Sequence, residues 1–239
     1  MQSSSNLFPV ALISAERRGD LSEDVYRLKP GNSPDGTVEL AVTRLGLADV
    51  AQSRGIPVVL VHGSFSNRRF WYSPKGIGLG AYLARQGFDV WIPEMRGHGL
   101  SRRNQDYARN RVADYARYDL PAIAAFVREQ SAQVPHWIGH SLGGTTLAAA
   151  LGGQYLGAPA VASVALFGCQ VSRTYWPLKI PPVEWGGATD LEALCSTFRF
   201  AAQAWSGRRT HWPCPGKHAL ARFVRAFWRC RARLVERPG

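Results

Sequence analysis

The residues best suited to chemistry lie in one short motif, GHSLGG, at positions 139–144. It follows a β-like run that begins at His136 and precedes an alanine-rich helical run that begins at Leu142. Between a strand and a helix, the serine of a Gly-x-Ser-x-Gly pattern occupies a sharp, strained turn that holds its hydroxyl clear of the sheet. Gly139 and Gly143 leave room for this close strand–helix approach. We therefore predict that Ser141 is a nucleophile for acyl transfer; the alternative is an ordinary glycine-rich turn.

A second segment, HGSF at positions 62–65, follows the apolar run PVVLVH. Acyl transfer places negative charge on a carbonyl oxygen, which two aimed backbone N–H groups can stabilise. One expected donor is the N–H of Leu142, at a helix N-terminus whose dipole favours an anion. The other is the N–H of Ser64, with Phe65 as the alternative. We interpret His62 as a residue that shapes the turn and takes no part in the chemistry.

These motifs lie in a chain that alternates strands and helices, which predicts an α/β fold with a mostly parallel sheet and helices on both faces. In such sheets the chemistry lies at the carboxyl ends of the strands. Helices are expected around Leu79–Gln86, Val112–Gln130 and Leu142–Leu151. Strands are expected at Val25–Leu28, Thr37–Arg44, Pro57–His62, Phe88–Pro93, His136–Gly139 and Val161–Gly168.

Four segments carry a family resemblance: PVVLVHGSF, FDVWIPEMRGHGLSR, YDLPAIAAFV and GHSLGGTT. With them the chain resembles the α/β-hydrolase superfamily, and in particular its acid lipase and steryl ester hydrolase branch with bacterial relatives. The resemblance covers about residues 20–185. It implies a cofactor-free, metal-free serine hydrolase acting on small carboxylic esters with an apolar acyl group. Ser141 stands where related synthases carry cysteine and dehalogenases carry aspartate.

The resemblance also implies that the catalytic acid and then the histidine follow the serine along the chain. His211 and His218 are the only histidines after Ser141, and the carboxylates there are Glu184, Asp190, Glu192 and Glu236. No β-like run that ends in an acid follows Gly168. We therefore expect the closing strands of the fold to be missing or replaced.

Other residues near these segments have structural interpretations. Glu94 and His98 belong to a loop expected to be structural, and Tyr118 and Asp119 are expected to anchor their helix. The aromatic cluster Phe65, Phe70, Trp71 and Tyr72 either lines an acyl-chain pocket or caps the sheet.

Charge divides the chain into a core and an unusual tail. The net charge is +12, of which residues 186–239 supply +7 from 10 basic and 3 acidic side chains. We therefore expect no nucleic-acid partner and divide the chain into an N-terminal extension (1–20), a core (21–185) and a basic tail (186–239). The apolar spacing Leu220, Phe223, Val224, Phe227 and Trp228 predicts a basic amphipathic helix.

Two explanations of the tail stay open. In the first it is a genuine variant, whose helix packs on the protein itself or lies on an anionic membrane. In the second a frame shift near Gly186 replaced the native ending, because the tail is rich in residues that GC-rich codons give out of frame.

The remaining composition gives an expected location and an alternative function. Four scattered cysteines without a C-x-x-C pair, and a start without a basic signal region, lead us to expect a cytoplasmic protein. If neither tail histidine reaches Ser141, the alternative is an inactive relative that binds a ligand or a membrane without turnover.

Overall fold

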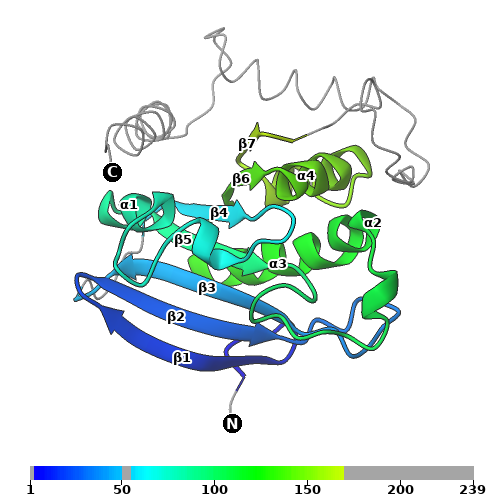
Figure 1. Cartoon of the computed structure of the whole chain (residues 1–239), viewed down its shortest axis with the longest axis horizontal. Helices are drawn as coiled ribbons and strands as arrows, with labels where there is room; N and C mark the ends of the chain where they lie inside the picture. Colours follow the sequence, from blue (N-terminus) through cyan, green and yellow to red (C-terminus); the bar gives the residue numbers. More distant parts are fainter. Residues whose placement is uncertain (1–2, 50–54, 170–239) are drawn as a thin grey trace, which may run out of the picture.

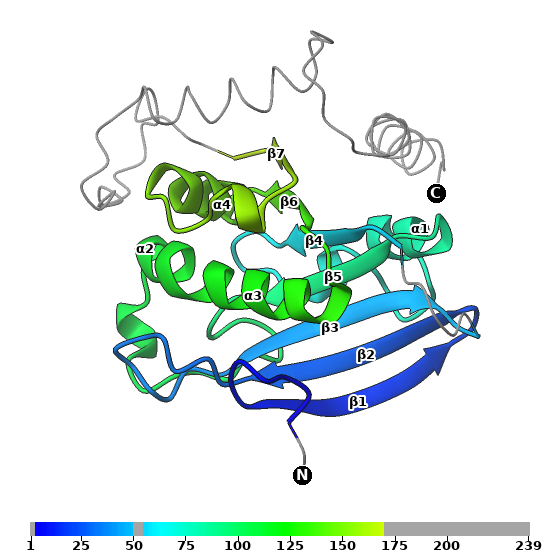
Figure 2. The same cartoon turned by 180° about the vertical axis from the view of Figure 1, so that it is seen from behind.

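The computed structural model describes residues 3–49 and 55–169, and one seven-stranded sheet runs through this part of the chain (Figure 1 and Figure 2). The strand order is β1-β2-β3-β5-β4-β6-β7. The strands are β1 (Val10–Arg18), β2 (Leu21–Leu28), β3 (Leu40–Leu47), β4 (Pro57–Val61), β5 (Asp89–Glu94), β6 (His136–His140) and β7 (Ser163–Phe167).

The sheet combines an antiparallel N-terminal part with a parallel part that holds the predicted motifs. β4 pairs in parallel with β5 and β6, and β6 pairs in parallel with β7. The pairs β1/β2, β2/β3 and β3/β5 are antiparallel, so β2 runs in the same direction as β4 to β7. Five of the seven strands thus share one direction, which confirms the expected mostly parallel sheet. The carboxyl ends of β4 to β7 lie together at one end of the strands, which we call the carboxyl edge of the sheet.

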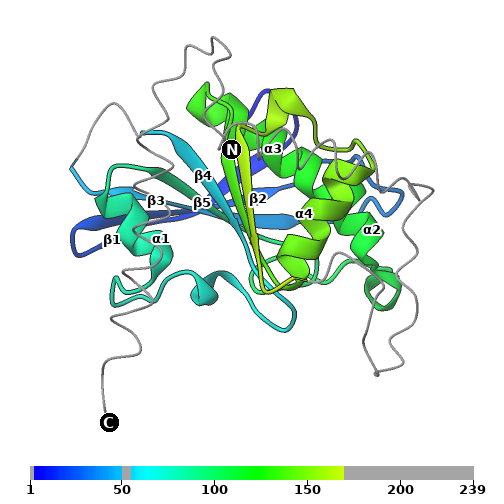
Figure 3. The same cartoon turned by 90° about the horizontal axis from the view of Figure 1, so that it is seen from above.

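Helices cover both faces of this sheet, as predicted. Figure 3 shows α1 (Leu79–Arg85) on one side and α3 (Leu120–Ser131) and α4 (Leu142–Gly152) on the other. The shorter turns are η1 (Arg68–Phe70), η2 (Tyr107–Arg109), α2 (Val112–Asp114), the π-helical η3 (Tyr115–Asp119) and η4 (Ala158–Ala160). None of the helices in the described part of the chain is long and apolar enough to span a membrane.

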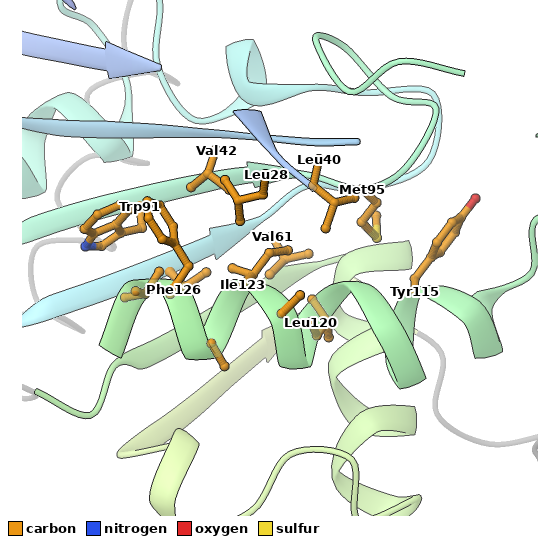
Figure 4. Close-up of a cluster of buried hydrophobic side chains, with 14 of the residues drawn as sticks. Leu28, Leu40, Val42, Val61, Trp91, Met95, Tyr115, Leu120, Ile123 and Phe126 are labelled. Atoms are coloured by element: carbon orange, nitrogen blue, oxygen red, sulfur yellow. The ribbon is translucent and has the colours of Figure 1, made fainter. Parts of the chain in front are cut away.

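The central strand β4 is buried on both faces, which explains its uninterrupted apolar sequence. Because successive side chains of a strand point to opposite faces, Val59 and Val61 pack toward α3, whereas Val58 and Leu60 pack toward α1. Figure 4 shows the α3 side of this core. There Phe126 meets the rings of Tyr26 and Trp91 edge-on, with centroids 5.3 and 5.7 Å apart.

The sheet begins earlier than the sequence indicated. Residues 1–20 were expected to be an extension outside the core, but Val10–Arg18 is strand β1 and pairs with Leu21–Leu28. Its pattern gave no signal because an edge strand with one face in water keeps few buried side chains, here chiefly Val10. The predicted strand at Thr37 also starts late, at Leu40, because the Thr37 N–H donates to the Asp35 side chain within a turn.

The helix predicted over 112–130 is confirmed over 112–131, with a π-helical stretch inside it. It starts with the short turn α2, widens into the π-helical η3 and only then becomes the regular helix α3. The predicted tail, its amphipathic helix and the candidates His211 and His218 lie outside the described residues.

We expect Phe126→Ala to lower the free energy of unfolding by about 3–5 kcal/mol, because it removes a buried ring and leaves a cavity between α3 and the sheet. Urea unfolding followed by circular dichroism measures this loss. Ile77→Ala is the control, since the Ile77 side chain is 59% exposed and its truncation should change stability by about 0.5 kcal/mol or less. Equal losses in the two variants would contradict the packing described here.

Candidate active site

Ser141 has the strained backbone that the motif predicts. It stands between β6 and α4 with φ of 51° and ψ of −120°, in the left-handed region that side-chain-bearing residues rarely adopt. Such a conformation costs on the order of 1–3 kcal/mol and persists only where the surroundings enforce it. One such constraint is the Ser141 N–H, which donates to the carbonyl oxygen of Phe167 at the end of β7 (3.1 Å).

Glycines allow three backbone segments to meet around this serine. A Cβ added at Gly139 would lie 2.6 Å from the Gly144 Cα. One added at Gly143 would lie 2.5 Å from the carbonyl oxygens of Val61 and His62. These distances are far below van der Waals contact, so β6, the start of α4 and the end of β4 touch through their main chains. The elbow roles expected for Gly139 and Gly143 have a direct steric basis.

The HGSF loop lies directly against Ser141. A Cβ added at Gly63 would be 3.0 Å from the Cβ of Ser141. The N–H of Leu142, in the first turn of α4, has no acceptor within its own helix. The structure thus brings together Ser141, Leu142 and the loop that contains Ser64. Phe65 has φ of 52° and a fully exposed ring.

His62 is a buried, neutral residue. Its ring is fully shielded from solvent, with Nδ1 2.8 Å from the Gly63 carbonyl oxygen and Nε2 accepting from the Met95 N–H at 3.3 Å. Burial lowers the pKa of His62 to about 4, and the His98 ring 5.1 Å away acts in the same direction. With both ring nitrogens engaged by the backbone, His62 is not placed to take a proton from Ser141.

Buried ionic contacts hold the loop that follows β5. The Glu94 carboxylate accepts from the Arg68 N–H (3.0 Å) and the Leu100 N–H (2.9 Å), which ties η1 to this loop. The Arg96 side chain donates to the Asp119 carboxylate from Nε (2.9 Å) and a terminal nitrogen (2.6 Å). The Arg96 N–H donates to the same carboxylate (3.1 Å), so Asp119 anchors the loop as well as its own helix.

His98 also has structural contacts. Its Nδ1 lies 3.1 Å from the Arg96 carbonyl oxygen, and its ring packs edge-on against Tyr115 with centroids 5.9 Å apart. These contacts agree with the structural interpretation of this loop.

The aromatic cluster divides into a cap and an exposed pair. Trp71 and Tyr72 are buried in the core on the α1 side, so they cap the sheet. Phe65 is fully exposed and Phe70 is 46% exposed. The Phe70 ring stacks on His140, the residue before the serine, at 4.4 Å and an angle of 13°. The sequence gives no signal for this contact of His140, because nothing in the motif distinguishes its side chain.

The candidates for the catalytic histidine and acid all follow residue 169. Residues 142–169 contain no histidine, aspartate or glutamate. His211 and His218 lie outside the described residues, as do all the carboxylates that follow Ser141. Within residues 3–49 and 55–169, no group of three or more histidine, cysteine, aspartate or glutamate side chains could hold a metal ion.

This architecture, with a serine elbow at the carboxyl edge of a largely parallel sheet, defines a hydrolase-type fold. Residues 56–175 match the family described as alpha/beta hydrolase fold. The chain therefore belongs to the α/β-hydrolase family, as its motifs predicted. A solved structure from Sulfolobus solfataricus has this fold with a TM-score of 0.50 and 12% identity, over 92% of this chain and 69% of its own.

Curated relatives include several lipases. Lipase member N of Mus musculus is 36% identical over 123 residues, which are 46% of this chain and 30% of the relative. Triacylglycerol lipase 2 of Arabidopsis thaliana is 30% identical over 136 residues, 54% of this chain and 31% of the relative. Gastric triacylglycerol lipase of Homo sapiens is 37% identical over 100 residues, 37% of this chain and 25% of the relative. The matches thus span a quarter to a third of these relatives.

We expect Gly143→Ala to destabilise the protein by about 1–3 kcal/mol, because the added methyl group overlaps the carbonyl oxygens of Val61 and His62. Thermal unfolding measures this loss. The control is Gly36→Ala, where the added methyl group meets nothing within 4 Å. The contact between β4 and α4 described here is wrong if both variants unfold like the parent protein.

Lowering the pH should reduce the free energy of unfolding because His62 is buried in its neutral form. Its folded pKa of about 4 lies below the usual value of 6.5, so the unfolded chain binds the proton more readily between these values. This stability is present above pH 6.5 and is lost as the pH falls toward 4, by about 2 kcal/mol between pH 7 and pH 5. Burial lowers the pKa of His136 as well, which adds a loss of the same sign.

Urea unfolding at pH 7 and pH 5 measures this acid loss. His62→Gln is the comparison, because its neutral amide does not titrate in this range. The loss on acidification should be smaller in this variant by about 2 kcal/mol. An identical loss in the parent protein and the variant would exclude His62 as its source.

Proposed function

We propose that the protein is a carboxylic-ester hydrolase that forms an acyl-enzyme on Ser141. One observation carries this proposal: the strained backbone of Ser141 at the junction of β6 and α4, with the HGSF loop packed against it. Strain at a single residue between regular elements is characteristic of functional sites. The lipases among the relatives support an ester as the substrate class.

In the proposed reaction the Ser141 Oγ attacks the ester carbonyl carbon, and the carbonyl oxygen becomes an oxyanion. The N–H groups of Leu142 and Ser64 stabilise this charge. The serine proton passes to a base and then to the leaving alcohol, as the bond between carbonyl carbon and alkoxy oxygen breaks. Water then attacks the acyl-enzyme and releases the acid. An alcohol in place of water gives acyl transfer through the same residues.

The base in this proposal is a histidine of the C-terminal quarter, with His211 and His218 as candidates. A serine hydroxyl is a weak nucleophile without such a partner. In a well-studied serine protease, loss of the histidine costs about 10⁶ in turnover, and the oxyanion hole and binding leave about 10³–10⁴ over water. Activity therefore depends strongly on whether one of these side chains reaches Ser141.

The exposed rings beside the serine favour an apolar acyl group. Phe65 and Phe70 both belong to the segment that follows β4, and Phe70 lies on His140 next to Ser141. An acyl chain bound against these rings would remove apolar surface from water, at about 25 cal/mol per Å².

We expect a fluorophosphonate probe to label the protein at Ser141, because the probe reacts with activated serine hydroxyls. Ser141→Ala should abolish labelling and reduce p-nitrophenyl ester cleavage to the spontaneous rate. Labelling is read by gel fluorescence and by mass spectrometry of the modified peptide.

The matched control is Ser14→Ala, since Ser14 lies in β1 at the opposite edge of the sheet. This variant should be labelled like the parent protein. Equal ester cleavage by the parent protein and Ser141→Ala would overturn the proposal and favour a relative that binds ligands without turnover.

A further inference from the structure

Both ring nitrogens of His62 contact backbone groups of two different strand ends. Nδ1 faces the carbonyl oxygen of the next residue, Gly63, at 2.8 Å. Nε2 accepts from the N–H of Met95, directly after β5, at 3.3 Å. The ring is fully buried, so no water competes for either nitrogen. His62 therefore links the end of β4 to the end of β5.

These two partners select one tautomer of the ring. A carbonyl oxygen only accepts hydrogen bonds, so the proton must lie on Nδ1. A backbone N–H only donates, so Nε2 must carry the lone pair. The pKa of about 4 that burial gives His62 keeps this neutral form populated at pH 7.

The bond to Gly63 fixes the orientation of the peptide between Gly63 and Ser64. No peptide bond in the described part of the chain is cis. In a trans peptide the C=O and the following N–H point in opposite directions. Because the Gly63 carbonyl points at the His62 ring, the Ser64 N–H points away from that ring.

This peptide begins at Gly63, the residue that packs against Ser141. The position of a Cβ at Gly63 is 3.0 Å from the Ser141 Cβ, so the loop leaves no space between itself and the serine. If the peptide rotated by half a turn, its carbonyl oxygen would replace the N–H. The negative end of the C=O dipole would then face the negatively charged oxyanion and repel it. Orientation of this single peptide thus decides between stabilisation and repulsion.

We propose that His62 is a positioning residue that holds the Gly63–Ser64 peptide in the orientation that presents the Ser64 N–H for the oxyanion. This inference rests on the proposed function of Ser141. His62 acts through the peptide and does not touch the reacting atoms. Its second bond, to Met95, fixes the ring itself, and Met95 is held by the adjacent Arg96, whose side chain and N–H bond Asp119.

Two substitutions of His62 test the two hydrogen bonds of its ring separately. The amide nitrogen of His62→Asn occupies a place near that of Nδ1 and can still donate to Gly63, but it leaves Met95 without an acceptor. The longer amide of His62→Gln reaches toward the place of Nε2 and can accept from Met95, but it leaves the Gly63 carbonyl without a donor. Each variant loses one buried hydrogen bond, so a purely structural role would affect both alike.

The first readout is kinetic. We expect kcat for p-nitrophenyl ester cleavage to fall by about 10²-fold in His62→Gln, the order of the loss of one oxyanion donor, with KM nearly unchanged. His62→Asn should retain kcat within about fivefold of the parent protein, since it keeps most of the oxyanion stabilisation. Equal losses in the two variants would overturn the proposal.

The second readout needs no activity. In ¹⁵N-labelled protein, the nitrogen shifts of the imidazole should show His62 protonated at Nδ1, and the Ser64 amide signal should move in His62→Gln more than in His62→Asn. A ring protonated at Nε2, or equal movement of the Ser64 signal, would overturn the positioning role. If Ser141 proves unreactive while these shifts are as expected, the proposed hydrolase function fails and the orientation of the peptide stands.

Discussion

Direct contact between main chains at the carboxyl edge of the sheet is the constraint on which the rest of the site depends. β6 reaches the start of α4 through Gly139, and α4 reaches the end of β4 through Gly143, with no room for a side chain at either position. The strain at Ser141 exists because these contacts and the bond from its N–H to Phe167 leave no relaxed alternative. The packing of the sheet thus compensates for the unfavourable backbone conformation of Ser141.

Ionic groups near this edge hold loops in place. Glu94 is buried and binds two backbone N–H groups, and Arg96 is paired with Asp119 inside the protein. A buried carboxylate or guanidinium is tolerated only when such partners compensate for lost hydration. These paired charges fix the loop after β5 relative to η1 and to the start of α3.

The sequence predicted the parts of the fold whose pattern is local. The apolar run of β4 and the GHSLGG turn can be recognised from the sequence alone. A strand covered on both faces and a tight strand–helix turn each strongly restrict which residues are tolerated. The edge strand β1 was missed because water on one face removes that restriction. The π-helical stretch Tyr115–Asp119 was missed because the apolar spacing of the segment is that of an ordinary helix, and the contact of Asp119 with the distant Arg96 leaves no local pattern.

His62 shows why the place of a residue in a turn was easier to predict than its contacts. Its position in HGSF indicated a turn, and the structure adds that the turn has a direction, set by one bond from the ring to the Gly63 carbonyl. A backbone donor has no side chain that a sequence could display, so its orientation is encoded in neighbours that bind the opposite end of the same peptide. In the proposed mechanism, oxyanion stabilisation therefore depends on residues that never contact the oxyanion, and substitution of such residues should change turnover more than binding.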